Sequence, residues 1–279
     1  MEIIFSKKCL EYESLGHPES PLRVKTSYEY LKEKGFGFLE PEPAKEEDIR
    51  IVHTKELIGS VKNLDFFDAD TPALAGIFDY ACLSAGAAIM AMELSLKSEA
   101  AFSLLRPPGH HAGRDFLGGF CYFNNLAVAV QKAILLGKKV AILDIDCHHG
   151  NGTQDIFLGR KDALYVSLHQ VPLYPGTGLK SDKNCLNYPL RAGTTEKEYL
   201  DTLKGAISQI KKFSPDLLAI SAGFDTYKDD PLTNIDLDIV SYGKIKELIV
   251  ATGLPYFCAL EGGYSPELKY CVYEFLKTP

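Results

Sequence analysis

One stretch constrains the fold of this chain more than any other, an unbroken apolar run at residues 140–143 that ends in charge. Asp144, Asp146 and His148 follow it at every second position. An apolar run without alternation is typical of a strand buried on both faces of a parallel sheet. Every second side chain of an extended segment points to the same side. The spacing therefore predicts that two carboxylates and an imidazole converge where this strand stops.

Such a convergence favours a divalent metal site. Open parallel sheets place their ligands at the carboxyl ends of the strands. Asp and His are suitable ligands for a borderline ion such as zinc, and a site with two or three protein ligands leaves a position for water. The plainer alternative is a strand exit at which Asp and His only face solvent. Two neighbouring carboxylates on the buried side argue against that alternative, because they need a cation to offset their repulsion.

Composition limits the remaining possibilities. The chain has 279 residues, 46% of them apolar, and a formal net charge of −7. One domain spanning residues 1–279 can hold it. The acidic balance and the lack of a Lys/Arg stripe argue against direct nucleic-acid binding and favour a cationic substrate. Seven scattered Cys without a CxxC pair, and no signal peptide, predict a cytoplasmic protein. No apolar run approaches the roughly 20 residues of a membrane span, so no membrane partner is expected.

Strand and helix patterns alternate along the chain, which predicts a parallel α/β fold with helices on both faces of the sheet. Two prolines place residues 17–23 in a loop. The expected strands are residues 2–5, 101–105, 140–143, 163–168, 217–221 and 256–260. The expected helices are residues 27–34, 41–51, 74–95, 124–136, 153–158, 196–213 and 239–252.

Four of the expected strands are followed by chemically useful side chains. His110 and His111 follow one strand, the Asp144 cluster follows the next, and Asp225 and Tyr264 follow two more. Taken alone, the paired His could be a surface turn, Asp225 a helix cap and Tyr264 a packed loop aromatic. Because all four groups lie at the same end of their strands, a common site explains them better.

At these positions the sequence resembles the zinc-dependent histone deacetylase and acetylpolyamine amidohydrolase superfamily, most closely its class II and bacterial members. The resemblance is carried by RPPGHHA at 106–112, GFCYFNN at 119–125, DIDCHHGNGTQD at 144–155, PGTG at 175–178, SAGFD at 221–225 and LEGGY at 260–264. It implies a single-domain, three-layer arginase/deacetylase-like fold. It also implies an amidohydrolase that removes an acetyl group from an N-acetylated amine by metal-activated water.

The resemblance implies roles for individual residues. The metal ligands would be Asp146, His148 and Asp225, holding Zn²⁺ or Fe²⁺, since both ions accept this set. The catalytic residues would be His110 oriented by Asp144, His111 oriented by Asn151, and Tyr264, whose hydroxyl would bind the developing oxyanion.

The resemblance further implies a narrow substrate tunnel. Phe120 and Tyr174 would form its walls, and the Gly119 carbonyl would accept the scissile N–H. Asp70 would be the rim carboxylate, and Arg23 would lie near an internal acetate-release cavity.

Bound K⁺ or Na⁺ is implied as well. The first site would involve the carbonyls of Asp144, Asp146 and His148 with Ser167. A second site would lie near Phe157.

Two departures from the family pattern affect the expectations. Asn151 stands where class I members carry Asp, so His111 should be harder to keep protonated. Tyr174 stands where deacetylases often carry Phe. The chain is also short for the family, which weakens the inference of a protein substrate.

The sequence is compatible with several functions. The first prediction is deacetylation of acetyl-lysine in a protein or peptide, and the alternative is deacetylation of acetylpolyamines or another small amine. An arginase-like dinuclear manganese enzyme would need further carboxylates where Cys147 and Phe224 stand. An inactive binding protein would be expected to lack the Tyr or a metal ligand, and this chain lacks neither.

Overall fold

A single parallel sheet organises the molecule. The computed structural model describes residues 1–277. The sheet strands are β1 (Glu2–Ile4), β2 (Ala101–Ser103), β3 (Val140–Asp144), β4 (Ala163–Gln170), β5 (Cys185–Leu190), β6 (Leu217–Ala222) and β7 (Tyr256–Leu260). Their order is β1-β2-β7-β6-β3-β4-β5, and every neighbouring pair is parallel. All carboxyl ends therefore lie at one edge, and β2, β7, β6 and β3 are consecutive neighbours there.

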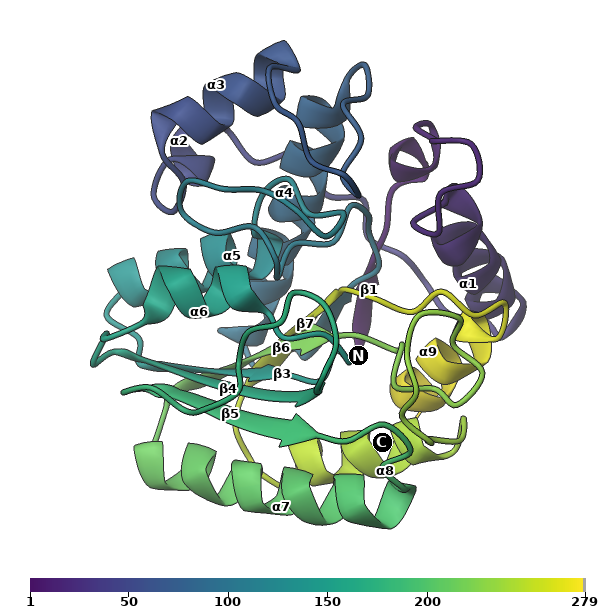
Figure 1. The fold of residues 1–279 in the computed structure, drawn as a ribbon, viewed down its shortest axis with the longest axis vertical. Helices are drawn as coiled ribbons and strands as arrows, with labels where there is room; N and C mark the ends of the chain where they lie inside the picture. The colour runs from purple at the N-terminus through teal and green to yellow at the C-terminus, as the bar shows by residue number, and fades with distance from the viewer. Residues whose placement is uncertain (278–279) are drawn as a thin grey trace.

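Helices cover both faces of the sheet, as predicted. They are α1 (Pro21–Glu33), α2 (Glu46–Ile49), α3 (Lys55–Asn63), α4 (Ile77–Ser95), α5 (Asn125–Leu135), α6 (Asn151–Phe157), α7 (Glu196–Phe213), α8 (Ser241–Val250) and α9 (Leu268–Lys277), with a short 3₁₀ turn at Lys7–Leu10. Figure 1 shows α7 and α8 beneath the sheet and α4, α5 and α6 above it, with α1 beside α9. This three-layer arrangement is the expected one.

The strands next to the site are the most deeply buried. Every residue of β3, β4 and β6 is buried, which matches their continuous apolar sequences. In β5, by contrast, buried and partly exposed residues alternate, and Pro189 lies within it. A proline is tolerated there because β5 is an edge strand and one of its sides needs no ladder hydrogen bonds. The sequence patterns did not reveal β5 for this reason.

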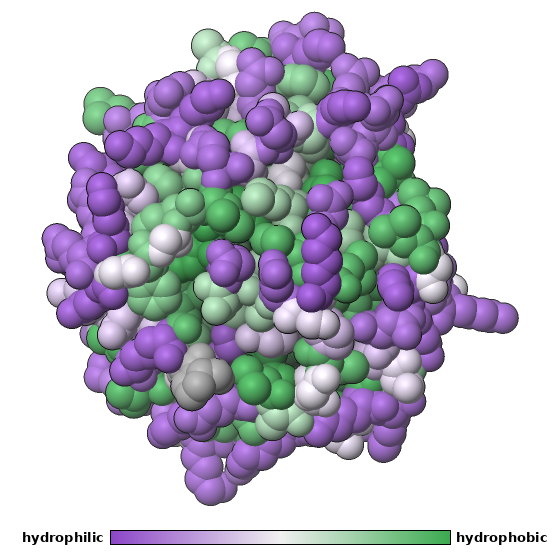
Figure 2. All heavy atoms as spheres, turned by 180° about the vertical axis from the view of Figure 1, so that it is seen from behind, coloured by the Kyte–Doolittle hydropathy of each residue, from purple (hydrophilic) through white to green (hydrophobic). Residues whose placement is uncertain are grey.

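Helix α4 is long and apolar enough, by length and composition alone, to cross a membrane. Its uninterrupted apolar run is shorter than a membrane span, as expected, because Asp79 and Glu93 lie within the helix. In the fold, however, 67% of its most apolar stretch is buried against the rest of the protein. Its small residues, such as Ala85, Ala87 and Ala88, are fully buried. Figure 2 shows the molecule from behind, where apolar side chains gather over the middle of the face and hydrophilic side chains surround them.

Four helices differ most from the predictions. Helix α2 spans Glu46–Ile49, which is only part of the expected residues 41–51. Helix α1 begins at Pro21 rather than at residue 27, so part of the expected loop is helical. Proline is well tolerated there because the first helical N–H needs no partner within the helix. Helices α3 and α9 were not predicted at all. The N-cap of α3 is Thr54, whose side chain accepts a hydrogen bond from Leu57 N, a signal that the sequence contained.

Candidate active site

Four consecutive strands bring the predicted groups together. The loops that follow β2, β7, β6 and β3 carry His110 and His111, Tyr264, Asp225, and Asp146 with His148. Because these strands are neighbours and all run in one direction, their loops meet at one edge of the sheet. The sequence specifies where each strand ends, and the order of the strands in the sheet brings these ends close together.

Asp146, His148 and Asp225 form a buried cluster. One potential ligand atom of each lies within 4.8 Å of the others. His148 Nδ1 is 3.1 Å from Asp146 Oδ1 and 2.7 Å from Asp225 Oδ2. Asp144 is not part of this cluster, although the alternating pattern alone placed it there. Its carboxylate turns toward His110 instead.

Backbone amides hold the two carboxylates from behind. Cys147 N donates to Asp225 Oδ1 at 2.7 Å, and Gly262 N donates to Asp146 Oδ2 at 2.7 Å. The approach is close enough to require glycine: a Cβ on Gly262 would lie 2.6 Å from Asp146 Oδ2, and one on Gly223 would lie 2.2 Å from the same atom. These hydrogen bonds from backbone amides thus fix the orientation of the two carboxylate groups.

The electrostatics of this cluster fit a divalent cation. Burial, and then the neighbouring Asp146 carboxylate, raise the pKa of Asp225 to about 7. Two fully buried carboxylates this close repel each other, and a cation between them would remove that cost. One imidazole and two carboxylates are a ligand set that Zn²⁺ or Fe²⁺ accepts. The three residues therefore suit a metal ion chemically as well as geometrically.

Two buried imidazoles stand beside the cluster, with ring centroids 4.0 Å apart. His110 Nδ1 lies 3.1 Å from Asp144 Oδ2, which also accepts a hydrogen bond of 2.9 Å from the Tyr165 hydroxyl. His111 Nδ1 lies 2.7 Å from Asn151 Oδ1. An amide oxygen only accepts, so His111 must carry its proton on Nδ1, which leaves Nε2 as its free nitrogen.

The two imidazoles have opposite electrostatic surroundings. Burial alone would lower the pKa of His110, but the carboxylates of Asp146 and Asp144 outweigh burial and raise that pKa to about 10. Burial, followed by the positive charges of His110 and His148, lowers the pKa of His111 well below its ordinary value. The neutral Asn151 amide does not compensate for this, in line with the expectation from sequence.

A pocket of about 350 Å³ leads to these groups. Among its lining residues are the predicted Asp70, Gly119, Phe120, Tyr174 and Tyr264, together with His111 and His148. Gly119 has a φ of +54°, and a Cβ there would lie 2.5 Å from His111 Cδ2. Only glycine leaves room for the imidazole at this point. The pocket also includes His17, Pro18 and Leu232, which sequence analysis did not single out.

Arg23 lies behind Tyr264. Its Nε donates to Gly263 O and its Nη2 to Glu261 O, both at 2.6 Å, and its guanidinium carbon lies 4.6 Å from the centroid of the Tyr264 ring. Phe120 meets the same ring edge-on at 5.7 Å. These contacts fix the ring and its loop from two sides.

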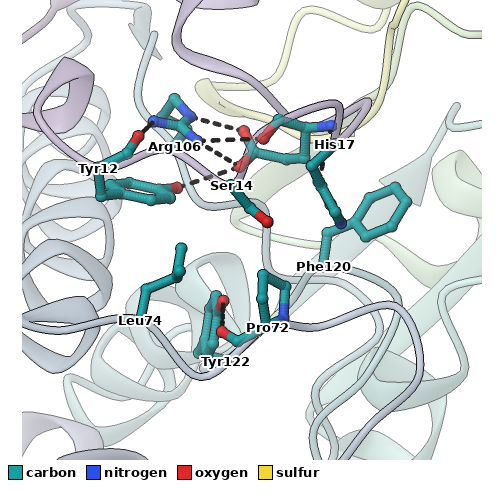
Figure 3. A pocket seen from close by; sticks show the side chains of 9 residues that line it. Tyr12, Ser14, His17, Pro72, Leu74, Arg106, Phe120 and Tyr122 are labelled. Carbon is teal, nitrogen blue, oxygen red and sulfur yellow. Dashed lines mark hydrogen bonds and ion pairs between the residues drawn. The ribbon is translucent and has the colours of Figure 1, made fainter.

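Two buried acids that support the site were missed from sequence. Glu261 Oε2 accepts hydrogen bonds from Gly109 N at 2.7 Å and His110 N at 3.1 Å, so it holds the loop of the paired imidazoles. Glu19 makes a two-point ion pair with Arg106, with both N–O distances 2.7 Å. Figure 3 shows the hydrogen bonds around Arg106, beside a cavity of about 10 Å³. Glu261 directly follows a buried strand, which was an available signal, whereas nothing local marked Glu19.

The residues expected near monovalent cations lie in two places. Ser167 pairs with Asp144 in the register of β3 and β4. Asp144 precedes Asp146 of the metal cluster by two residues. Phe157 is the last residue of α6 and is buried. Its carbonyl accepts hydrogen bonds from Arg160 N and from the Asn184 side chain.

Comparison with known proteins identifies the family of the chain. The histone deacetylase domain model matches residues 17–278. A "Probable deacetylase" of Archaeoglobus fulgidus is 38% identical, over 95% of this chain and 81% of its own. "Acetylpolyamine amidohydrolase 2" of Pseudomonas aeruginosa is 42% identical, over 72% of this chain and 62% of its own. The chain thus covers less than two thirds of that relative.

Solved structures give the same result. The crystal structure of the HDA15 HD domain superposes with a TM-score of 0.93 and 32% identity, over 99% of this chain and 86% of that one. The acetylpolyamine aminohydrolase of Burkholderia pseudomallei gives a TM-score of 0.87 and 29% identity, over 99% and 97%. The fold is the α/β fold of the deacetylase and amidohydrolase enzymes. This chain belongs to the histone deacetylase family.

Proposed function

We propose that the protein is a metal-dependent amidohydrolase that removes the acetyl group from a linear N-acetylated amine. The observation that carries this proposal is the convergence of a three-residue metal cluster, two imidazoles and a tyrosine at the end of one pocket. Residues 1–279 would act as a single catalytic domain, and the acidic, CxxC-free composition favours the cytoplasm.

Asp146, His148 and Asp225 would hold Zn²⁺ or Fe²⁺. A bound divalent ion supplies polarisation of the acyl oxygen and a lower pKa for its water. The protein contributes the fixed orientation of the ligands, through the amides of Cys147 and Gly262.

His110 and His111 would move the protons of the reaction. Amide hydrolysis needs one group that takes a proton from the attacking water and one that returns a proton to the leaving amine. Asp144 and Asn151 each hold one ring through its Nδ1, so each Nε2 is left for this exchange. His111 is the imidazole of the pair that lines the pocket and would therefore meet the substrate.

Tyr264 would donate a hydrogen bond to the acyl oxygen as negative charge develops on it. Its ring lines the pocket and contacts Arg23 and Phe120, so these two residues hold the ring and its hydroxyl in one orientation. Pre-organised donors of this kind stabilise the transition state more than the ground state.

The pocket would receive a linear chain. Phe120 and Tyr174 line it together with Gly119, whose carbonyl would accept the scissile N–H, and Asp70 lies in its lining as an exposed acid. Among the lining residues there is no Lys or Arg. A carboxylate without a competing basic group fits either the backbone N–H groups of a peptide or a second ammonium group of the substrate.

Two substrates meet these requirements. Acetyl-lysine in a peptide or protein is the first candidate. An acetylated polyamine is the second, because four relatives of 39–42% identity carry the name acetylpolyamine amidohydrolase. An arginase-like second metal is disfavoured, since Cys147 and Phe224 are buried in the apolar core where further carboxylates would be needed.

The test compares kcat/KM for an acetyl-lysine peptide and an acetylated polyamine, in the natural protein and in Asp70→Asn. An amide oxygen still accepts from a peptide N–H, but it no longer pairs with an ammonium group. We therefore expect the substitution to reduce kcat/KM by about fivefold to tenfold for the polyamine and less for the peptide. Asp65→Asn, an exposed acid just before the rim, is the matched control. No measurable hydrolysis of either substrate by metal-loaded protein would contradict the proposed function.

A first monovalent cation site would lie beside the metal cluster. His169 Nε2 donates to Gly178 O at 3.0 Å, and its pKa is lowered to about 4, chiefly by burial, so the ring is neutral. Its Nδ1 must then accept from Ser167 Oγ, which lies at 2.8 Å. The lone pairs of Ser167 thus remain for K⁺ or Na⁺, as do the carbonyls of Asp146 and His148, to which no described N–H donates.

A further inference from the structure

Asn184 occupies a place where a second cation would be expected. It directly precedes β5 and is half-buried. Its side chain faces the loop between α6 and β4, which begins after Phe157 and ends at Ala163. The carbonyl oxygens of this loop are the groups that would have to bind an ion near Phe157.

Both ends of the Asn184 amide form hydrogen bonds with this loop. Nδ2 donates to Phe157 O at 2.8 Å and to Ala163 O at 3.0 Å. Oδ1 accepts from Gly159 N at 2.6 Å. The opposite orientation of the amide would place an oxygen against two carbonyl oxygens and an NH₂ group against an N–H. The contacts therefore fix which end of the amide faces the carbonyls.

We propose that the Asn184 side chain replaces a monovalent cation at this loop, so that the chain has no second ion site near Phe157. K⁺ and Na⁺ bind where several carbonyl oxygens converge and replace the hydration shell of the ion. An NH₂ group satisfies two such oxygens with two polarised hydrogens and occupies the space between them. The Asn184 amide thus links Phe157 and Ala163, at the two ends of the loop, without an ion.

The carbonyls of the two expected cation sites differ in their hydrogen bonding. Those of Phe157 and Ala163 accept from the Asn184 amide, whereas no N–H within residues 1–277 donates to the carbonyls of Asp146 and His148. Among the described residues, the carbonyls at the first site thus accept no hydrogen bond from an N–H, whereas those near Phe157 already accept hydrogen bonds from Asn184.

The experiment removes the amide and measures ion dependence. Melting temperature and Tl⁺ binding by calorimetry, with Tl⁺ as the K⁺ substitute, are compared for the natural protein and Asn184→Ala, both with their divalent metal retained. At low K⁺ the variant should lose roughly 2 to 8 °C in melting temperature, because three hydrogen bonds are lost. It should bind one more Tl⁺ than the natural protein, and K⁺ at constant ionic strength should restore part of the loss.

Asn63→Ala is the matched control, because Asn63 is exposed at the end of α3. It should bind as many ions as the natural protein. If Asn184→Ala does not fold, Asn184→Asp tests the same point, since a carboxylate facing two carbonyls needs a cation and its folding should require K⁺ or Na⁺. Equal Tl⁺ stoichiometry in the natural protein and the folded variant would overturn the proposal. So would folding of both variants that is independent of K⁺ and Na⁺.

Discussion

The buried acid Glu19 gives the strongest quantitative prediction about stability. Glu19 and Arg106 are almost fully inaccessible to solvent, with side-chain exposures of 4% and 1%. The carboxylate accepts from Arg106 Nε and Nη2, and from Arg23 Nη1 at 3.1 Å. The substitution Glu19→Gln keeps the shape of the side chain but removes its charge. Two buried guanidinium groups then lose the carboxylate that they share.

The expected loss of stability is about 3 to 5 kcal/mol, the range for breaking a buried ion pair by removing one partner. Arg106 would keep its bonds to the carbonyls of Cys9 and Tyr12, and Arg23 its bonds to Gly263 and Glu261. These hydrogen bonds satisfy the N–H groups but do not neutralise the buried positive charge, so the loss of stability remains. The melting temperature should fall by roughly 5 to 9 °C, because a domain of this size has an unfolding entropy of about 0.6 kcal/mol per K.

The pH dependence follows from the pKa of Glu19. Burial alone would raise this pKa, but the Arg106 guanidinium outweighs burial and lowers it below the ordinary value of 4.5. A lowered folded-state pKa stabilises the protein fully above the unfolded value, and the contribution is lost as pH falls through the folded value. The difference between the natural protein and Glu19→Gln should therefore be constant near pH 7 and shrink below about pH 4.5.

Urea unfolding and thermal melting, followed by circular dichroism, measure these effects. Glu47→Gln is the control, because Glu47 pairs with Lys45 on the surface, where 75% of its side chain is exposed. That substitution should leave the melting temperature unchanged. A loss of less than about 1 kcal/mol for Glu19→Gln at pH 7 would show that the buried ion pair does not stabilise the fold.

The remaining predictions concern the site. Tyr264→Phe should lower turnover by roughly a hundredfold to a thousandfold, with metal content and melting temperature nearly unchanged, because the ring contacts stay and only the hydroxyl is lost. Near-normal turnover would remove Tyr264 from the chemistry. Asp225→Ala should lose both bound metal and activity, as elemental analysis and turnover would measure, and a variant that keeps about one equivalent of metal would show that Asp225 is not a ligand. A long-chain aryl hydroxamate should inhibit at micromolar concentration, since it would reach the metal cluster between Phe120 and Tyr174. Lack of inhibition would indicate that the pocket is closed to such a chain.

Local sequence determined the strands and the groups that follow them. Continuous apolar runs such as residues 140–143 and 217–221 predicted β3 and β6, because a strand covered on both faces can carry no polar side chain before it ends. The polar residues after these runs were predicted for the same reason. The family motifs also named Asp146, His148 and Asp225, which the structure brings together.

Segments without a strong local pattern were missed or misplaced. Strand β5 has partly exposed positions and a proline, so nothing in its own residues distinguishes it from a loop. Pro21 read as a loop residue, although the first turn of a helix accepts proline. In both cases the deciding contact, a neighbouring strand or the rest of the helix, lies outside the local pattern.

Residue spacing alone did not decide which polar groups lie together, and the tertiary structure did. Asp144 shares the alternation of Asp146 and His148, yet its carboxylate faces His110, while Asp225 from another strand lies beside Asp146 and His148. Glu19 meets Arg106 across 87 positions of the chain. Sequence periodicity specifies the side of a strand on which a residue lies, but distances between strands depend on their order in the sheet. That order is fixed by the packing of the helices and strands of the whole domain.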